Sequence, residues 1–386
     1  MSQSDGEKGI VLLPISHVDH GNINELSRHL GEGFSQIGLD PVFIDMRDGM
    51  APAVDAIIEW VSTGRVRLYV TVNALGFPHQ SQDLFAKNDV KLFFMSLDHP
   101  SYVVDLIMEI PAGAGVSFPT KSNIPLAQNG LRKDVAFHHI LHASHERTVR
   151  SWDERDIPIF LVGNLEENPA AMKHRWKEQG NDVARVLREM EIVYRENPLI
   201  ALEEVGAEAL RREIQHQVDM RSFLNLLVLF DRYNRSVCRK RLLDAIPDLP
   251  VTVVGNWDGY PAEKRAKASF LGPVDSPVVA EMVGRSKIVL DVLPTYYGSH
   301  ERVFAAMASG SIVATTAKNY PDALTTDGGL VELDVGSTVQ ETLAALLDDD
   351  MSAQETAGKG LAVFRAGHSW TDRARQIWNA VEAGGF

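Results

Sequence analysis

The sequence contains a single cysteine, Cys238, among its 386 residues, so no internal disulfide can form. Small disulfide-stabilised scaffolds are therefore excluded, and a reducing compartment is expected. Long apolar runs are also missing. The most apolar stretch, residues 223–230, is far shorter than the ~20 residues that span a bilayer. The first residues, MSQSDGEKG, lack the apolar core of a signal peptide, and we expect a cytoplasmic protein with no transmembrane segment.

Positive charge is scarce, because 38 Lys and Arg stand against 52 Asp and Glu and give a net charge of −14. Non-specific binding to nucleic acid needs a basic face, and so does electrostatic adhesion to anionic lipid. Both are therefore excluded as general properties of this chain. A ligand that carries phosphate needs only a local basic patch, which remains compatible with the composition.

Several catalytic signatures are absent. No G-x-G-x-x-G or P-loop pattern follows an expected strand, which argues against an NAD-dependent dehydrogenase or a P-loop nucleotidase. No G-x-S-x-G elbow is present, so a serine hydrolase is unsupported. The apolar fraction of 45% is that of an ordinary globular chain, and the length suggests two domains of about 150 residues or more each.

Short apolar runs alternate with helical periodicity in both halves of the chain. Residues 9–15, 66–72 and 91–95 read as strands in the first half, and residues 251–254, 287–293 and 311–316 in the second. Such alternation predicts α/β architecture with parallel sheets covered on both faces. The charge-rich stretch between them, about 166–221, has no convincing strand and is interpreted as a helical insertion.

The segment 294–310, PTYYGSHERVFAAMASG, carries the most chemical information. A strand ends before it, and Ser299 is expected to be the N-cap of the following helix. Free amides and the dipole at a helix start favour an anion. Arg302 in the first turn opposes the dipole unless it meets an anionic partner, which suits a diphosphate gripped by paired hydrogen bonds. Glu301 can accept hydrogen bonds from hydroxyls, and a solvated first turn is the alternative reading of both residues.

Residues 298–316, GSHERVFAAMASGSIVATT, resemble the donor-site helix of the GT-B glycosyltransferases. The nearest likeness is to the CgeB-like (spore maturation protein) group, with a motif of the kind R-x-F-E-A-M-A-x-G-x-x-x-x-T. The matching positions are Arg302, Phe304, Met307, Ala308, Gly310 and Thr315. Ala305 replaces the glutamate of that group, and Glu301 is a possible substitute.

Two further segments support the resemblance. His368-Ser369-Trp370, followed by Arg373 and Ala374, resembles the terminal motif of the same group. Residues 159–164 and 251–256 resemble its strands that end in glycine. The likeness implies two Rossmann-like domains facing a cleft: an acceptor domain at 1–152 and a nucleotide-sugar domain at 153–367 that contains the insertion. It also implies a terminal helix, 368–386, that returns to the first domain.

The resemblance implies a glycosyltransferase of the hexosyltransferase type, which moves a sugar from a nucleotide diphosphate sugar to an acceptor hydroxyl. No cofactor or metal is expected, because arginine and helix amides stabilise the leaving diphosphate. Trp257 would stack on a ring or take a buried packing role. The expected donor-binding residues are Gly255, Asn256, Trp257, Tyr296, Tyr297, Gly298, Ser299, His300, Glu301 and Arg302.

A base that deprotonates the acceptor is sought in the first domain. Residues 20–26 resemble the G-H-I-N-P-L entry of some GT-B transferases, although Asn22 stands where their histidine would be. His20 is favoured as the base, then Asp19, because an imidazole with a neighbouring carboxylate suits proton removal. His17 and Asn22 are expected to bind the acceptor. Hydrogen bonds within the loop are the alternative for these residues.

Asp98 and His99 follow the strand 91–95 and form a second candidate pair. Asp98 is the third choice for the base, and His99 is expected to bind the acceptor. The alternative is that Asp98 caps the helical stretch that begins at Ser101.

A metal site is disfavoured at both clusters that suggest one. His138, His139, His142 and His145 match no zinc spacing, and residues 135–140 read as a strand. The acidic run 348–350 ends a helical segment, so it is interpreted as solvated. Two other functions stay open: a non-catalytic sugar- or nucleotide-binding scaffold, which the Ala305 and Asn22 departures favour, and a sugar-nucleotide epimerase on the same fold.

Overall fold

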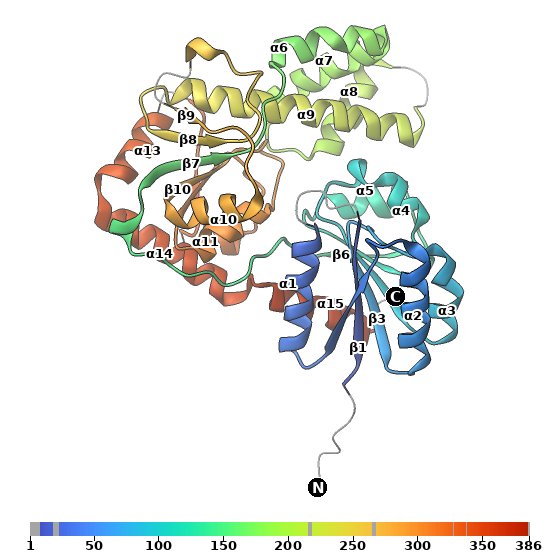
Figure 1. Cartoon of the computed structure of the whole chain (residues 1–386). Coiled ribbons are helices and arrows are strands. Elements are labelled where there is room, and N and C mark those ends of the chain that lie inside the picture. Colours follow the sequence, from blue (N-terminus) through green and yellow to red (C-terminus); the bar gives the residue numbers. More distant parts are fainter. Residues whose placement is uncertain are drawn as a thin grey trace. The chain divides into compact units, whose positions relative to one another are not determined.

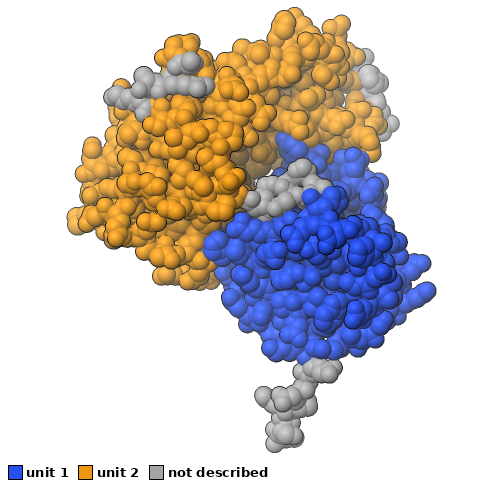
Figure 2. Space-filling view, viewed as in Figure 1, with its two compact units in different colours: residues 1–145, 368–386 blue, residues 146–367 orange. Residues whose placement is uncertain are grey.

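The computed structural model describes residues 8–17, 23–214, 218–264, 268–326, 328–336 and 338–384. The chain forms two compact units, shown in Figure 1 and coloured separately in Figure 2. Unit 1 comprises residues 1–145 and 368–386, and unit 2 comprises residues 146–367. The first boundary lies seven residues before the expected one. Trp152 accounts for part of this difference, because its side chain is buried in the hydrophobic core of unit 2.

Unit 1 is built on a six-stranded sheet in the order β2-β1-β3-β4-β5-β6, and every neighbouring pair is parallel. The inner strands β1, β3, β4 and β5 are mostly buried on both faces, as expected for a sheet covered by helices on each side. The edge strands β2 and β6 are only partly buried. They are β1 (Ile10–Ile15), β2 (Asp40–Asp45), β3 (Val66–Val72), β4 (Lys91–Met95), β5 (Gly115–Phe118) and β6 (Ala136–His139).

Helices connect these strands and bury one apolar stripe each. Separate hydrophobic clusters on the two faces of the sheet show that both faces are covered. The helices are α1 (Ile23–Gln36), α2 (Met50–Ser62), α3 (Gln82–Lys87), α4 (Val104–Glu109) and α5 (Asn123–Gly130), with short 3-10 turns η1 (His79–Ser81) and η2 (Pro100–Tyr102).

The terminal helix α15 (Trp370–Glu382) belongs to unit 1 and packs against α1. Gly33 permits this contact, because a Cβ atom there would lie 2.7 Å from the carbonyl oxygen of Trp370. Ser369 and Asp372 form a capping box at the start of α15. Arg373 is 1% exposed and donates from Nε and Nη2 to the carbonyl of His142, at 3.1 and 3.0 Å. The terminal motif therefore fastens α15 to unit 1.

Unit 2 repeats the plan with a second parallel sheet, ordered β12-β11-β10-β7-β8-β9. The strand order reverses between β7 and β10, and ligands of open parallel sheets bind beyond the carboxyl ends of strands at such a point. The strands are β7 (Ile157–Val162), β8 (Val251–Val254), β9 (Ser269–Phe270), β10 (Ser286–Asp291), β11 (Ile312–Thr315) and β12 (Val331–Glu332).

The predicted helical insertion is present in unit 2 as a group of helices that pack on one another (Figure 1). It consists of α6 (Pro169–Arg175), η4 (Trp176–Gln179), α7 (Asn181–Glu196) and α8 (Leu202–Glu213), and it packs against α9 (Met220–Ala245). The remaining helices are η3 (Trp152–Glu154), η5 (Ala262–Lys264), α10 (Ser276–Arg285), α11 (Glu301–Ala308), α12 (Asp322–Thr325), α13 (Val339–Asp348) and α14 (Asp350–Gly367).

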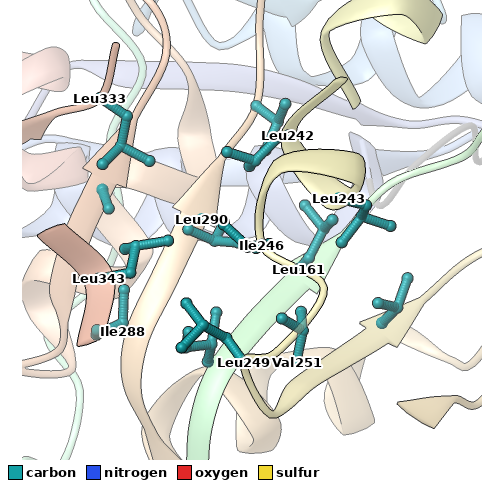
Figure 3. Packing of buried hydrophobic residues seen from close by; sticks show 14 of the residues in the cluster. Leu161, Leu242, Leu243, Ile246, Leu249, Val251, Ile288, Leu290, Leu333 and Leu343 are labelled. Atoms are coloured by element: carbon teal, nitrogen blue, oxygen red, sulfur yellow. The ribbon is translucent and has the colours of Figure 1, made fainter. Parts of the chain in front are cut away.

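The carboxyl-terminal part of α9 is fixed by the core of unit 2. Leu242 and Leu243 of this helix and its C-cap residue Ile246 pack with Leu161 of β7 and Leu290 of β10 in one cluster (Figure 3). All five side chains are at most 5% exposed. The apolar face of this part of α9 is therefore buried in the core, and only its other faces are available to contact a ligand. Among the described residues, no helix combines the length and the apolar composition needed to cross a membrane.

Candidate functional site

Two strands of unit 2 end in glycine-asparagine pairs that interlock. The Gly255 backbone has φ 116°, and a Cβ there would lie 2.1 Å from the carbonyl oxygen of Gly163, so only glycine fits. The side chain of Asn164 accepts a hydrogen bond from the amide of Asn256 at 2.9 Å. These turns bring the ends of β7 and β8 together and leave them free of bulky side chains.

Helix α9 places three charged residues on one face near these turns. Asp231, Arg235 and Arg239 recur every four residues, a spacing that aligns side chains along a helix. Arg239 donates from Nη1 to the carbonyl of Asn164 at 2.5 Å. The charged face of α9 therefore lies against the carboxyl end of β7.

Asp231 organises the loop that follows β10. It is fully buried and accepts hydrogen bonds from the hydroxyls of Tyr296, at 2.7 Å, and Tyr297, at 2.9 Å. Nε of Arg235 donates to the same carboxylate at 2.8 Å, and its guanidinium lies 4.7 Å from the centre of the Tyr297 ring. The hydrogen bonds of Tyr296 and Tyr297 thus fix the Asp231 carboxylate, which in turn holds the guanidinium of Arg235.

Asp291, the last residue of β10, is the anionic partner that Arg302 requires. Its carboxylate is fully buried and lies 2.9 Å from Nδ1 of His300 and 3.9 Å from Nη1 of Arg302. It also accepts hydrogen bonds from Thr315 at 2.8 Å and Tyr320 at 2.9 Å. Burial alone would raise the pKa of Asp291, but the charges and hydrogen bonds around it hold that pKa at about 2.

Three arginines converge beside these two acids. Desolvation lowers the pKa of Arg239 to about 10, and the charges of Arg235 and Arg302 contribute to that shift. Desolvation also lowers the pKa of Arg302, and Arg235 adds to the effect. Among the described residues, no carboxylate forms an ion pair with Arg239. Glu301, which is exposed, also acts on Arg302. The buried part of the cluster nevertheless holds more positive than negative charge, which is the electrostatic character of a polyanion site.

The structure changes the roles of several predicted donor residues. Ser299 is not the N-cap: it is 2% exposed, and the helix begins after His300, whose side chain turns to Asp291 instead. Trp257 is 3% exposed and packs edge-on against Phe270 in the core, so it has taken the packing role. Glu301 is exposed in the first turn of α11.

Other predicted donor residues shape the loop that follows β10 or bind Asp231. Gly298 allows the loop to approach Asn319, whose carbonyl oxygen would lie 2.4 Å from a Cβ at that position. Tyr296 is 4% exposed and Tyr297 is partly buried, and both point their hydroxyls at Asp231. Thr315, the last position of the resemblance motif, donates to Asp291.

The sequence analysis did not identify Asp231, Arg235, Arg239 or Asp291. The four-residue spacing within α9 is a signal that was available, but such spacing is common on solvated helices. Asp291 is the acidic residue that ends an otherwise apolar strand. A buried acid needs a charged or hydrogen-bonding partner, so this position could have been predicted to form a buried charge pair.

The predicted acceptor loop of unit 1 lies partly outside the described residues. Asp19, His20 and Asn22 fall in the segment 18–22 and receive no placement. His17 is exposed just before it. On the other side of the loop, the Asn24 side chain closes two hydrogen bonds with the backbone of Ser16, at 2.8 and 2.9 Å.

Asp98 and His99 do lie at the carboxyl edge of the unit 1 sheet, in different roles. The capping alternative is realised by His99, whose Nδ1 accepts from the Ser101 amide at 3.1 Å, and not by Asp98. Asp98 is partly buried and accepts a hydrogen bond from Asn73 at 2.9 Å. Asn73 and Ala74 have φ of 51° and 56°, in the left-handed region that L-residues seldom adopt. Such strained residues cluster at functional sites.

The four histidines of the disfavoured metal site face different groups, and the ring centre of His138 lies 5.7 Å from that of Phe93. His139 lies 3.3 Å from the carbonyl of Pro119, and His142 lies 3.1 Å from that of Leu97. His145 stacks on His29 with ring centres 4.2 Å apart. Within the described ranges, no group of three or more histidine, cysteine or acidic side chains is arranged to hold a metal ion.

The chain was compared with known protein families and solved structures. A family model described as "Glycosyl transferase-like" matches residues 235–379, somewhat over a third of the chain. That range includes the carboxyl-terminal part of α9 from residue 235 on, the segment 294–310 and most of α15. A search of curated proteins found no match.

Solved structures with the same fold cover nearly the whole chain. Sucrose-phosphate synthase from Thermosynechococcus elongatus is 12% identical, with TM-score 0.57 over 97% of this chain and 99% of that one. A glycosyltransferase from Rickettsia africae is 10% identical, with TM-score 0.53 over 98% and 99%. The beta-glucosyltransferase of phage T4, solved with UDP-glucose, is 10% identical, with TM-score 0.52 over 97% and 99%.

These similarities establish the fold and confirm the predicted architecture. The chain has the GT-B fold of two Rossmann-like domains, each with a parallel six-stranded sheet. The CgeB-like resemblance remains an expectation from the sequence. The family model covers less than half of the chain, and Arg235, Arg239 and Arg302 lie within the residues that it matches.

Proposed function

We propose that the protein is a glycosyltransferase that transfers a sugar from a nucleotide diphosphate sugar to an acceptor hydroxyl. Unit 2 binds the donor at the carboxyl ends of β7, β8 and β10. The reaction needs no metal, because the arginines and the amides at the start of α11 stabilise the charge that develops on the leaving diphosphate.

The observation that carries the proposal is the arginine cluster. Desolvation lowers the pKa values of Arg239 and Arg302, and the charge of Arg235 adds to both shifts. The buried acids Asp231 and Asp291 balance these arginines only in part. A guanidinium grips two phosphate oxygens at once through its fork of N–H donors. The cluster lies where the strand order reverses, which is the usual ligand position of such sheets.

The sugar nucleotide requires a partner for its ribose as well. Ala305 occupies the position of the glutamate in the resembling group, and Glu301 lies one turn earlier on the same face of α11. Glu301 is exposed and Ala305 is partly exposed, so a ligand can reach both positions. We assign the ribose hydroxyls to Glu301.

The donor site is tested by calorimetry with UDP, GDP, ADP and dTDP. Replacing Arg302 with alanine is expected to weaken binding of the preferred diphosphate by about 1.5–3 kcal/mol, the value of a charge-assisted bond. Arg188→Ala is the control, because Arg188 is an exposed arginine on α7. Equal affinities for wild type and Arg302→Ala would refute the donor-site assignment.

Turnover separates the enzyme from its two alternatives. A transferase releases nucleoside diphosphate from the nucleotide sugar and forms a product with the acceptor. An epimerase interconverts sugar nucleotides with no acceptor, and a scaffold protein binds the nucleotide without either change. Detection of isomerised donor by mass spectrometry would replace the proposal with the epimerase.

The acceptor base is proposed to come from unit 1. Asp98 is the described candidate, held by Asn73 at the strained carboxyl end of β3. Asp98→Asn is expected to lower turnover by at least the ~10²-fold that a positioned base contributes. Donor affinity should stay unchanged, because the donor cluster belongs to unit 2. His20→Ala and Asp19→Ala are the parallel tests, and near-normal turnover in all three variants would exclude these bases.

A further inference from the structure

A second cavity lies in unit 2, outside the arginine cluster. Its volume is about 410 Å³, and its walls come from α7, α9 and the segments that follow β10, β11 and β12. Helices α7 and α9 pack on each other (Figure 1), so the insertion closes one side of this cavity. The volume is at the small end of the ~300–1,000 Å³ typical of ligand pockets.

The periodicity of α9 separates the cavity from the arginine cluster. Residues 234, 237, 238 and 241 line the cavity and follow helical spacing along one face. Arg235 and Arg239 follow Asp231 along a neighbouring face and take part in the cluster. The two sites therefore share a helix but use different faces of it.

Part of the cavity wall is apolar. Val237 of α9 lies there with Leu293 and Leu333 from the segments after β10 and β12, and with Pro198 beyond α7. Leu293 and Leu333 are 1% and 2% exposed, so they belong to the fixed core. Such walls favour a ligand with an apolar body, because burial of its surface is the main source of affinity.

A buried amide supplies a directional contact. Asn234 is 4% exposed, and its Nδ2 meets no acceptor with hydrogen-bond geometry among the described residues. The hydroxyl of Tyr194 beside it is engaged with Thr295, at 2.7 Å to Oγ1 and 3.1 Å to the amide nitrogen. Burial raises the pKa of Tyr194, and its hydrogen bonds with Thr295 oppose part of that rise. A ligand oxygen would supply the acceptor that Nδ2 lacks.

The charged residues of the cavity wall indicate that the ligand is an anion. Arg195, Arg241 and Lys318 line the cavity against a single acid, Asp334. Lys318 is already paired with Asp334 at 3.0 Å and with Glu332 at 3.2 Å. Over the described part of the chain, neither arginine forms an ion pair with a carboxylate. The cavity therefore has two uncompensated cations.

We propose that this cavity is a second ligand site, which binds a small organic anion: a carboxylate carried on an apolar ring system. The ring lies against Val237 and Leu293, and the carboxylate meets the Nδ2 of Asn234 and the arginines. The proposal does not depend on sugar transfer. It is distinct from the proposed donor site, because the residues that line the cavity lie on a different face of α9 from Arg235 and Arg239.

The test is titration of the full chain with 2-naphthoate and its neutral isostere 2-naphthamide, followed by ligand fluorescence and calorimetry. We expect the carboxylate to bind at least tenfold more tightly than the amide. Val237→Trp fills the cavity and should abolish binding. Val278→Trp is the matched control, because Val278 is 47% exposed on α10, and it should bind as wild type does.

A charge variant keeps the test decisive if Val237→Trp does not fold. Arg241→Gln should weaken naphthoate binding at least threefold and leave naphthamide unchanged, whereas Arg188→Gln on α7 should change neither. Equal affinities for the acid and the amide would overturn the proposal, as would undiminished binding to a folded Val237→Trp variant. Loss of binding in Arg302→Ala but not in Arg241→Gln would assign the anion to the arginine cluster and also overturn it.

Discussion

Replacing Arg239 with methionine should separate stability from ligand binding. Arg239 is held close to Arg235 and Arg302, and desolvation and these charges lower its pKa from 12.5 to about 10. Methionine keeps an unbranched apolar stem of similar length and removes the charge. We expect the variant to be at least as stable as the wild type and yet to bind nucleoside diphosphate more weakly.

The magnitude follows from the pKa shift. A folded-state pKa below the ordinary value means that the fold favours the neutral side chain. At pH 7 the side chain is charged in both the folded and the unfolded states, so its charge lowers the free energy of unfolding. The shift corresponds to at most ~3 kcal/mol, and solvent near this partly exposed group reduces it to ~1–2 kcal/mol. Loss of the hydrogen bond to Asn164 costs ~1 kcal/mol in the other direction. The net change should be between zero and about +1 kcal/mol.

The assay combines urea unfolding with calorimetry on the same preparations. Arg239→Met should unfold at the same or a higher urea concentration, while its affinity for the preferred nucleoside diphosphate falls at least tenfold. Arg239→Lys, which keeps the charge, should retain more of the affinity without the gain in stability. Destabilisation by 2 kcal/mol or more, with unchanged affinity, would show that Arg239 is a structural residue, and the interpretation of the cluster would fail.

Three further outcomes are expected. Gly33→Ala should lower the free energy of unfolding by ~1–3 kcal/mol in urea titrations, because its Cβ meets the Trp370 carbonyl at 2.7 Å; an unchanged midpoint would mean that α15 shifts without cost. Burial and the Arg373 charge lower the pKa of His368 to about 4. Stability should therefore fall as the pH drops from about 6.5 towards 4, and His368→Gln should flatten that dependence. Transferase activity should survive EDTA, and recovery of lost activity by Mg²⁺ or Mn²⁺ would contradict the proposed metal-free reaction.

The sequence was sufficient to predict the fold because its strands are nearly continuous apolar runs. Residues 66–72 and 91–95 coincide with β3 and β4, and the predicted helical insertion is present. The strands β5, β9 and β12 were missed. Two residues, as in β9 and β12, carry no periodicity, and the four residues of β5, GVSF, lack the run of β-branched residues that VTVV of β8 provides. Pairing with a longer neighbouring strand is what makes these segments strands.

Predicting the site was harder because the charges that form it come from distant parts of the chain. Arg302 was recognised by its unfavourable position in a helix start, and its partner Asp291 lies eleven residues earlier. Arg235 and Arg239 reach the site only because α9 packs its apolar face against β7 and β10. Single-position reasoning also favoured Ser299 as the N-cap, whereas His300 occupies the N-cap position and turns its ring to the buried carboxylate.

The incomplete balance of charge in unit 2 accounts for the stability of the cluster and for its proposed use as a diphosphate site. With no acids, three arginines this close would strongly oppose folding, because each would be desolvated beside like charges. With an acid for each arginine, the cluster would have no electrostatic reason to bind an anion. Asp231 and Asp291 each hold one arginine in place, and Arg239 is held instead by a neutral carbonyl. The remaining positive charge is therefore already positioned, and binding of the proposed diphosphate would relieve repulsion that the folded protein carries without it.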